Sequence, residues 1–118
     1  MYKRQVGDRV ELELENENQG NIHGVLPRKN YIARQSPKSR LQLHLIACNI
    51  DQALLISCMR DPILKIGFID RFLLTTEPQN IPVIIVINKW DIYTESDKSE
   101  YNELKNVYEK IGYEVHAV

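Results

Sequence analysis

The chain has 118 residues, of which 43% are hydrophobic and 26% charged, and its formal net charge at pH 7 is −1. This size fits one ordinary domain or two small units, and a charge near zero gives no general reason to expect nucleic acid or a membrane as partner. The sequence shows no signal-peptide pattern and no apolar run of 18 residues, so we expect a cytoplasmic protein.

The charges are distributed unevenly along the chain. Residues 1–42 carry eight Lys or Arg against five Asp or Glu, whereas residues 43–118 carry seven against eleven. No acidic residue occurs from residue 18 to residue 50, and this segment holds five cations: Arg28, Lys29, Arg34, Lys38 and Arg40. The asymmetry predicts two units with different partners.

Cysteine and histidine give no pattern of metal ligands. Cys48 and Cys58 lie ten positions apart without a C-x-x-C pair, and the three histidines are scattered through the chain. We interpret the cysteines as small apolar side chains in a reducing compartment. We therefore predict neither a metal site nor a catalytic residue within the 118 residues.

Short strands are predicted in the first third of the chain. Apolar and acidic residues alternate from Val10 to Glu15, which predicts a half-buried strand. The sequence QGN at 19–21 predicts a turn, and a second strand follows through Val25.

A break at Pro27 precedes a third predicted strand around residues 31–33. Short strands separated by Gly and Pro are typical of a small antiparallel β barrel or a remnant of one. The polar sequence QSPKSR at 35–40 predicts a linker. We therefore place one domain at residues 1–40, linker included, and a second at residues 41–118.

After the linker the hydrophobic pattern changes to that of an α/β domain. Apolar runs at 53–58 and 83–87 predict strands, and the last six residues begin another. Two helices are predicted between these strands, with apolar faces at helical spacing formed by Ile69, Phe72, Leu73 and Thr76 in one helix and by Tyr101, Leu104, Tyr108 and Ile111 in the other. In the second helix, Ser96 is the expected N-cap and Gly112 follows the end. This order predicts a parallel sheet with strands buried on both faces.

The second apolar strand ends in the tetrad Asn88, Lys89, Trp90 and Asp91. Ligands of parallel sheets bind beyond the carboxyl ends of the strands, which is where this tetrad is expected to lie. A carboxylate accepts hydrogen bonds from guanine N1–H and the exocyclic amine, while an amide contacts another base edge and a lysine stem covers one face. In the alternative interpretation, Asn88 and Asp91 only cap a turn. Trp90 either flanks a nucleotide or packs on the sheet.

The tetrad resembles the N-K-x-D motif of translation-factor-like GTPases, but no phosphate-loop pattern G-x-x-x-x-G-K-[ST] precedes it. An ordered set of segments resembles the ribosome-small-subunit-dependent GTPase A family, whose GTPase domain is circularly permuted: GDRVELE, GVLPRKNYIARQ, NIDQALLISC, GFIDRFL and VINKWD. The resemblance extends from Val6 to Val118. Residues 1–5 fit nothing that follows, and the chain stops abruptly at Val118, before the phosphate loop that the resemblance implies. We therefore interpret the chain as an N-terminal fragment.

The resemblance implies a partial OB-fold barrel that contacts ribosomal RNA, followed by the incomplete parallel sheet of a circularly permuted P-loop GTPase domain. It implies that Asn88, Lys89, Trp90 and Asp91 contact the guanine of GTP, and that the whole protein acts in late maturation of the small ribosomal subunit. It further implies GTP and Mg²⁺ as cofactors, with zinc only in a C-terminal domain beyond residue 118. The expected partners are the small subunit, its rRNA and GTP or GDP, with no membrane and a monomeric state.

A second interpretation is a non-catalytic RNA-binding module with an α/β scaffold. Its contacts would be the five cations named above, Arg28, Lys29, Arg34, Lys38 and Arg40, with Tyr31 as a stacking ring. In the alternative, these cations form an ordinary solvated surface. The two functions are compatible in one protein, and we expect the 118 residues alone to be inactive towards GTP because phosphate-binding residues are required for hydrolysis.

Overall fold

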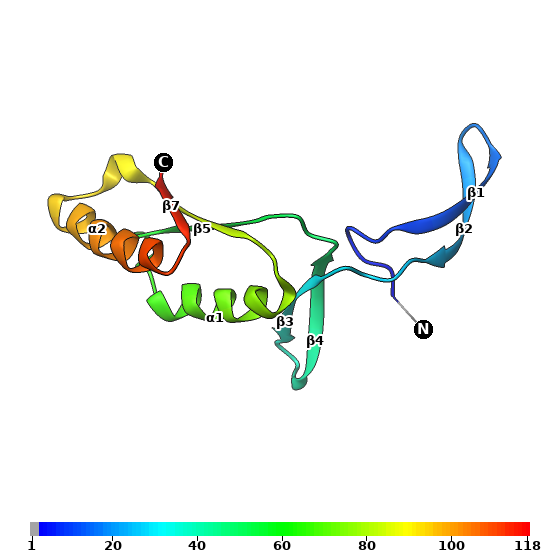
Figure 1. Cartoon of the computed structure of the whole chain (residues 1–118), viewed down its shortest axis with the longest axis horizontal. Coiled ribbons are helices and arrows are strands. Elements are labelled where there is room, and N and C mark those ends of the chain that lie inside the picture. The colour runs from blue at the N-terminus through cyan, green and yellow to red at the C-terminus, as the bar shows by residue number, and fades with distance from the viewer. Residues whose placement is uncertain (1–2) are drawn as a thin grey trace. The chain divides into compact units, whose positions relative to one another are not determined.

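The computed structural model describes residues 3–118, apart from the side chain of Arg40. The chain forms two compact units, Met1–Ile50 and Asp51–Val118 (Figure 1). The first unit thus continues to Ile50, whereas the sequence analysis placed the boundary between residues 40 and 41.

The first unit consists of two antiparallel hairpins, each of which forms a two-stranded sheet of its own. Its strands are β1 (Val10–Asn16), β2 (Gln19–Val25), β3 (Tyr31–Ser36) and β4 (Ser39–Cys48). Within residues 3–50 these strands do not close into a barrel.

Both hairpin turns differ from the predictions. The first turn lies at residues 17–18, before QGN, because the Asn16 side chain accepts a hydrogen bond from the Asn18 backbone at 2.9 Å. The second lies at residues 37–38, where Ser36 Oγ accepts from the Lys38 backbone at 3.2 Å. The predicted linker at 35–40 is therefore the β3–β4 connection, and β4 is a strand that the sequence analysis missed.

Strand β1 is not half-buried as predicted. All seven of its residues are exposed, with Leu12 at 55% and Leu14 at 71%. The alternation correctly predicted a strand, but within the described residues neither face of β1 is covered. Burial depends on a partner surface, which the periodicity of one strand does not specify.

The segment before β1 is attached to the end of β4. The Cys48 backbone N–H donates to the Val6 carbonyl at 3.0 Å, and the Asn49 side chain donates to the Gly7 carbonyl at 2.9 Å. Gly7 has φ +91°, and a Cβ at this position would lie 2.0 Å from the Cys48 carbonyl oxygen. This close approach therefore requires glycine.

The second unit is a three-stranded parallel sheet with two helices, as the alternating pattern predicted. The strands follow the order β5-β6-β7. The elements are β5 (Ala53–Cys58), α1 (Ile66–Thr76), β6 (Val83–Asn88), α2 (Glu95–Lys110) and β7 (Glu114–Ala117), with short 3-10 turns at Glu77–Gln79 and Trp90–Ile92. Strand β6 is thus the central strand, and its carboxyl end carries the tetrad.

Only one face of this sheet is buried in the described chain, so the prediction of two buried faces is wrong. Ile85 and Ile87 of β6 are fully buried, and alternate residues of the neighbouring strands are buried with them. On the other face, Leu54 and Ile56 are 58% and 60% exposed. Two consecutive crossover helices between neighbouring parallel strands cover the same side of a sheet, which accounts for the asymmetry.

Helix α2 starts earlier than predicted. Thr94, not Ser96, is the N-cap: its hydroxyl accepts from the Asp97 backbone at 3.3 Å, while the Asp97 carboxylate accepts from the Thr94 backbone at 2.9 Å. Reciprocal bonds of this kind satisfy two otherwise unpaired donors. At the other end Gly112 has φ +101° as expected after a helix, but Ile111 is 64% exposed and does not belong to the buried face.

Candidate functional site

The tetrad lies where the central strand of the parallel sheet ends. Asn88 is the last residue of β6, Lys89 adopts the left-handed backbone conformation (φ 67°, ψ 34°), and a 3-10 turn begins at Trp90. Asn88, Lys89 and Asp91 are exposed, whereas Trp90 is half-buried. The motif side chains are therefore accessible at the edge of the sheet where ligands of parallel sheets bind.

Two hydrogen bonds hold the first half of the tetrad. Asn88 Oδ1 accepts from the Lys89 backbone at 2.8 Å, which is a bond of the type that a simple turn would make. The Lys89 ammonium donates to the backbone carbonyl of Asp61, in the loop that follows β5. Lys89 therefore connects the ends of two neighbouring strands.

Asp91 behaves differently from a turn-capping residue. Within residues 3–118 its carboxylate accepts no hydrogen bond and forms no ion pair, although the residue is exposed at the end of the sheet. A capping carboxylate would accept a bond from a nearby backbone N–H. The geometry thus favours a carboxylate that is available to a ligand.

Trp90 packs on the protein. Its ring makes edge-to-face contacts with Tyr93 and with Tyr101 of α2, at centroid distances of 5.8 Å and 5.1 Å. The Lys98 ammonium lies 5.6 Å from the ring centroid, within the range of a cation–π contact. The sequence left two positions open for this ring, beside a nucleotide or on the sheet. The printed ring contacts are with the following turn and with α2, and they fix the loop between Lys89 and Asp91.

Arg28, one of the predicted RNA contacts, is paired with a carboxylate from outside the basic segment. Its Nε lies 2.8 Å from Asp8 Oδ1 and its Nη2 lies 3.0 Å from Oδ2, and the two side chains are only 13% and 3% exposed. Hydrogen bonds from Arg28 and from the Cys48 thiol hold the pKa of Asp8 well below its usual range. Arg28 therefore stabilises the first unit, and its charge is largely compensated.

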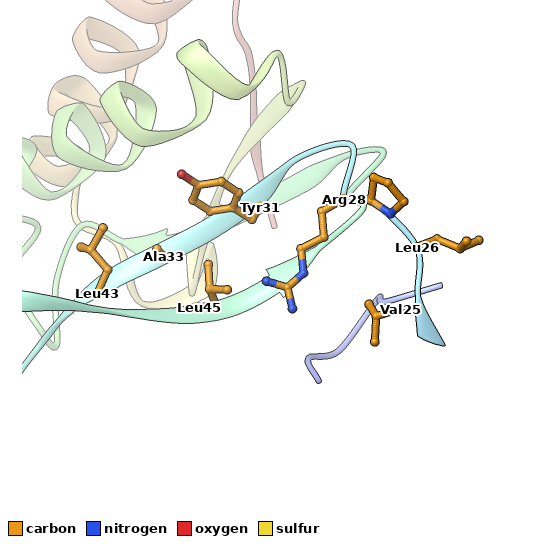
Figure 2. Close-up of a pocket in the computed structure, with 8 residues that line it drawn as sticks. Val25, Leu26, Arg28, Tyr31, Ala33, Leu43 and Leu45 are labelled. Carbon is orange, nitrogen blue, oxygen red and sulfur yellow. The ribbon is translucent and has the colours of Figure 1, made fainter. Parts of the chain in front are cut away.

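The other basic candidates differ in their surroundings. Lys29, Arg34 and Lys38 are exposed, and the side chain of Arg40 lies outside the described residues. Tyr31 is 40% exposed and lines a groove of about 830 Å³ between the two hairpins. Figure 2 shows the groove, whose other lining residues are Val25, Leu26, Pro27, Arg28, Ala33, Leu43 and Leu45.

Residues 3–118 contain no group of three or more His, Cys, Asp or Glu side chains that could hold a metal ion. No helix among these residues is both long and apolar enough to cross a membrane.

Comparison with known proteins identifies the family. The RsgA GTPase family model matches residues 25–118. The chain belongs to the RsgA GTPase family. Two similar relatives are both named small ribosomal subunit biogenesis GTPase RsgA. The protein from Cytophaga hutchinsonii is 46% identical over 110 residues, which are 92% of this chain and 36% of the relative. The protein from Porphyromonas gingivalis W83 is 40% identical over 110 residues, 92% of this chain and 35% of the relative.

Two solved structures are similar as well. YjeQ from Thermotoga maritima matches with a TM-score of 0.75 and 32% identity, over 98% of this chain and 38% of its own. YloQ, described as a circularly permuted GTPase, matches with a TM-score of 0.70 and 29% identity, over 98% of this chain and 37% of its own. These matches confirm the predicted family and the circularly permuted GTPase fold. The chain spans about a third of the length of the Cytophaga hutchinsonii and Porphyromonas gingivalis relatives.

The structure places further residues beside the tetrad that the sequence analysis did not single out. Tyr93 contacts the backbone at the ends of two strands, Asp61 provides a carbonyl to Lys89, and Asp97 pairs with Arg60 at 3.2 Å. Most of these partners are separated by about 30 residues or more and several are backbone atoms, so no spacing in the sequence indicates them.

Proposed function

We propose that residues 88–91 form the guanine-recognition part of a GTPase that acts in late maturation of the small ribosomal subunit. The observation that carries this proposal is the position of an unpaired Asp91 carboxylate, together with Asn88 and Lys89, at the carboxyl end of the central parallel strand. The names of the relatives, small ribosomal subunit biogenesis GTPase, support the assignment of process and reaction class.

The chemistry of recognition follows from the three side chains. The Asp91 carboxylate accepts hydrogen bonds from guanine N1–H and from the exocyclic amine. Adenine has an acceptor at N1, so the carboxylate would face a lone pair and reject it. The Asn88 amide contacts the opposite base edge, and the Lys89 stem covers one face of the ring.

These contacts alone do not suffice for tight binding. Each of the few hydrogen bonds contributes on the order of 1–3 kcal/mol, which the cost of immobilising the nucleotide largely offsets. Hydrolysis further requires groups that hold the phosphates. GTP and Mg²⁺ would serve the whole protein.

We expect the complete gene product to be a cytoplasmic monomer. The purified protein should hydrolyse GTP in preference to ATP, and its rate of GTP hydrolysis should rise when purified small ribosomal subunits are added. The isolated 118 residues are expected to show no turnover under the same conditions. Phosphate release at steady state measures both. Equal rates with GTP and ATP, or turnover by the 118 residues alone, would contradict the proposal.

A second proposed function, RNA binding by the first unit, is compatible with the first. It is supported by the exposed cations Lys29, Arg34 and Lys38 and by the partly exposed ring of Tyr31 beside the groove. An OB-like barrel completed by further strands would present such a surface to rRNA. Arg28 is excluded from the first tests because Asp8 already pairs with it.

For the RNA-binding unit, we expect the affinity for a small-subunit rRNA fragment to fall steeply as salt rises. The triple variant Lys29→Gln, Arg34→Gln, Lys38→Gln should bind more weakly, and the slope of log affinity against log salt should decrease by about one for each phosphate that is no longer neutralised. Filter binding at several salt concentrations measures this slope. A matched variant of three cations in the second unit, Lys98→Gln, Lys105→Gln and Lys110→Gln, controls for net charge. Identical slopes for the triple variant and the wild type would refute RNA contact by these residues.

A further inference from the structure

Tyr93 occupies an unusual position next to the tetrad. The residue is only 7% exposed, and its hydroxyl lies between two backbone groups. It accepts a hydrogen bond from the Met59 N–H at 2.7 Å and donates one to the Asn88 carbonyl. One side chain therefore joins the carboxyl ends of β5 and β6.

The sheet geometry explains why a bridging hydroxyl is needed at this point. The last residue pair between β5 and β6 is Cys58 with Asn88, so the Met59 N–H and the Asn88 carbonyl lie where the strand pairing stops. Buried backbone groups without ladder partners must find others. A hydroxyl can donate and accept at the same time, whereas a phenyl ring can do neither.

The Tyr93 ring is itself held in place. It makes an edge-to-face contact with Trp90 of the tetrad, with the two ring planes 69° apart. Burial raises the pKa of the Tyr93 hydroxyl, so the group stays protonated and keeps its donor function at neutral pH.

Two more contacts join the loop after β5 to the segment that follows β6 and runs into α2. The Lys89 ammonium donates to the Asp61 carbonyl, and Arg60 Nε lies 3.2 Å from Asp97 Oδ2. Three consecutive residues after β5, Met59 to Asp61, are thus connected to the segment that contains the tetrad. Among the contacts made by Tyr93, Lys89 and Arg60, only that of Tyr93 is made by a buried side chain to a backbone atom of the tetrad.

We propose that Tyr93 is a positioning residue for guanine recognition: its hydroxyl fixes the Asn88 peptide and thereby the direction of the Asn88 amide and of the Asp91 carboxylate. This inference rests on the proposed function. Paired hydrogen bonds to a base edge weaken when the side chains shift by about 0.5 Å or turn by roughly 10–20°. The absence of the bridge therefore reduces base discrimination more than it reduces phosphate binding.

The test uses Tyr93→Phe in the complete gene product, with Tyr108→Phe as a matched control. Tyr108 is also buried, at 4% exposure, and its hydroxyl donates to Asp70 at 2.6 Å, away from the tetrad. Each variant removes the hydroxyl without changing the shape of the ring, so both should fold. Dissociation constants are measured for GDP, for IDP, which lacks the exocyclic amine, and for ADP.

We expect Tyr93→Phe to weaken GDP binding about tenfold, the effect associated with one buried hydrogen bond, and to reduce the preference for GDP over IDP. Tyr108→Phe should keep the wild-type preference even where its thermal stability falls. An unchanged GDP-to-IDP preference in Tyr93→Phe would overturn the inference and leave the proposed function intact. A wild-type protein that does not prefer GDP over ADP would instead overturn the proposed function, and the inference with it.

Discussion

Replacing Asp91 by asparagine is expected to weaken binding of guanine nucleotides by the complete gene product at least about 100-fold. Two charge-assisted hydrogen bonds to N1–H and the exocyclic amine are removed or weakened, each worth about 1.5–3 kcal/mol. An asparagine amide also turns a donor towards the guanine amine, which is itself a donor. Xanthine has a carbonyl in place of that amine, so the variant should gain affinity for XDP. Titration calorimetry with GDP, XDP and ADP measures all three affinities.

Glu95→Gln is the matched control for this exchange. Glu95 is an exposed carboxylate four residues further along, and the change from acid to amide is the same. It should leave the preference for GDP over XDP unchanged. If Asp91→Asn also retained that preference, the carboxylate would not contact the base, and Asp91 would be only a turn residue.

Replacing Ile85 by alanine should lower the free energy of unfolding by about 3 kcal/mol, within the range found for large-to-small changes at buried positions. Ile85 is fully buried at the centre of β6, where its register partners are Leu55 and Val115. Removing its outer carbons leaves a cavity between the sheet and the helices. Urea unfolding of the 118-residue chain, followed by circular dichroism, measures the change.

Ile56→Ala provides the comparison within the same sheet. Ile56 is 60% exposed on the opposite face of β5, so the same substitution should cost less than about 1 kcal/mol in this chain. Equal destabilisation of the two variants would show that the burial pattern of the sheet is wrong. The pair thus tests whether one face of the sheet, and not both, forms the core of the described unit.

The second unit could be predicted largely from sequence because its signals are contiguous. An apolar run followed directly by Asn88–Asp91 specifies both a buried strand and the place where it ends. The buried face of helix α2 was indicated by the helical spacing of Tyr101, Leu104 and Tyr108, all of which are buried. The cap was misplaced because Thr94 and Ser96 are both suitable hydroxyls, and the choice depends on the position of the Asp97 carboxylate.

The first unit was harder to predict because its stabilising contacts are remote in sequence. Arg28 looked like an uncompensated cation, yet its partner Asp8 lies 20 residues earlier, outside the segment without acidic residues. Strand β4 did carry a signal, the alternation of Leu41, Leu43 and Leu45, but Pro37 suggested a linker when it belongs to a hairpin turn. Tyr93 had no signal, because its hydroxyl contacts two backbone groups from different strand ends.

The most direct test of the central claim is a structure of the complete gene product with GDP bound. We expect the Asp91 carboxylate oxygens to lie about 2.6–3.2 Å from guanine N1 and the exocyclic amine, with the Lys89 stem against one face of the ring. The Asn88 amide should face the opposite edge of the base. A guanine bound elsewhere, with Asp91 directed into solvent, would contradict the claim that this tetrad recognises the nucleotide.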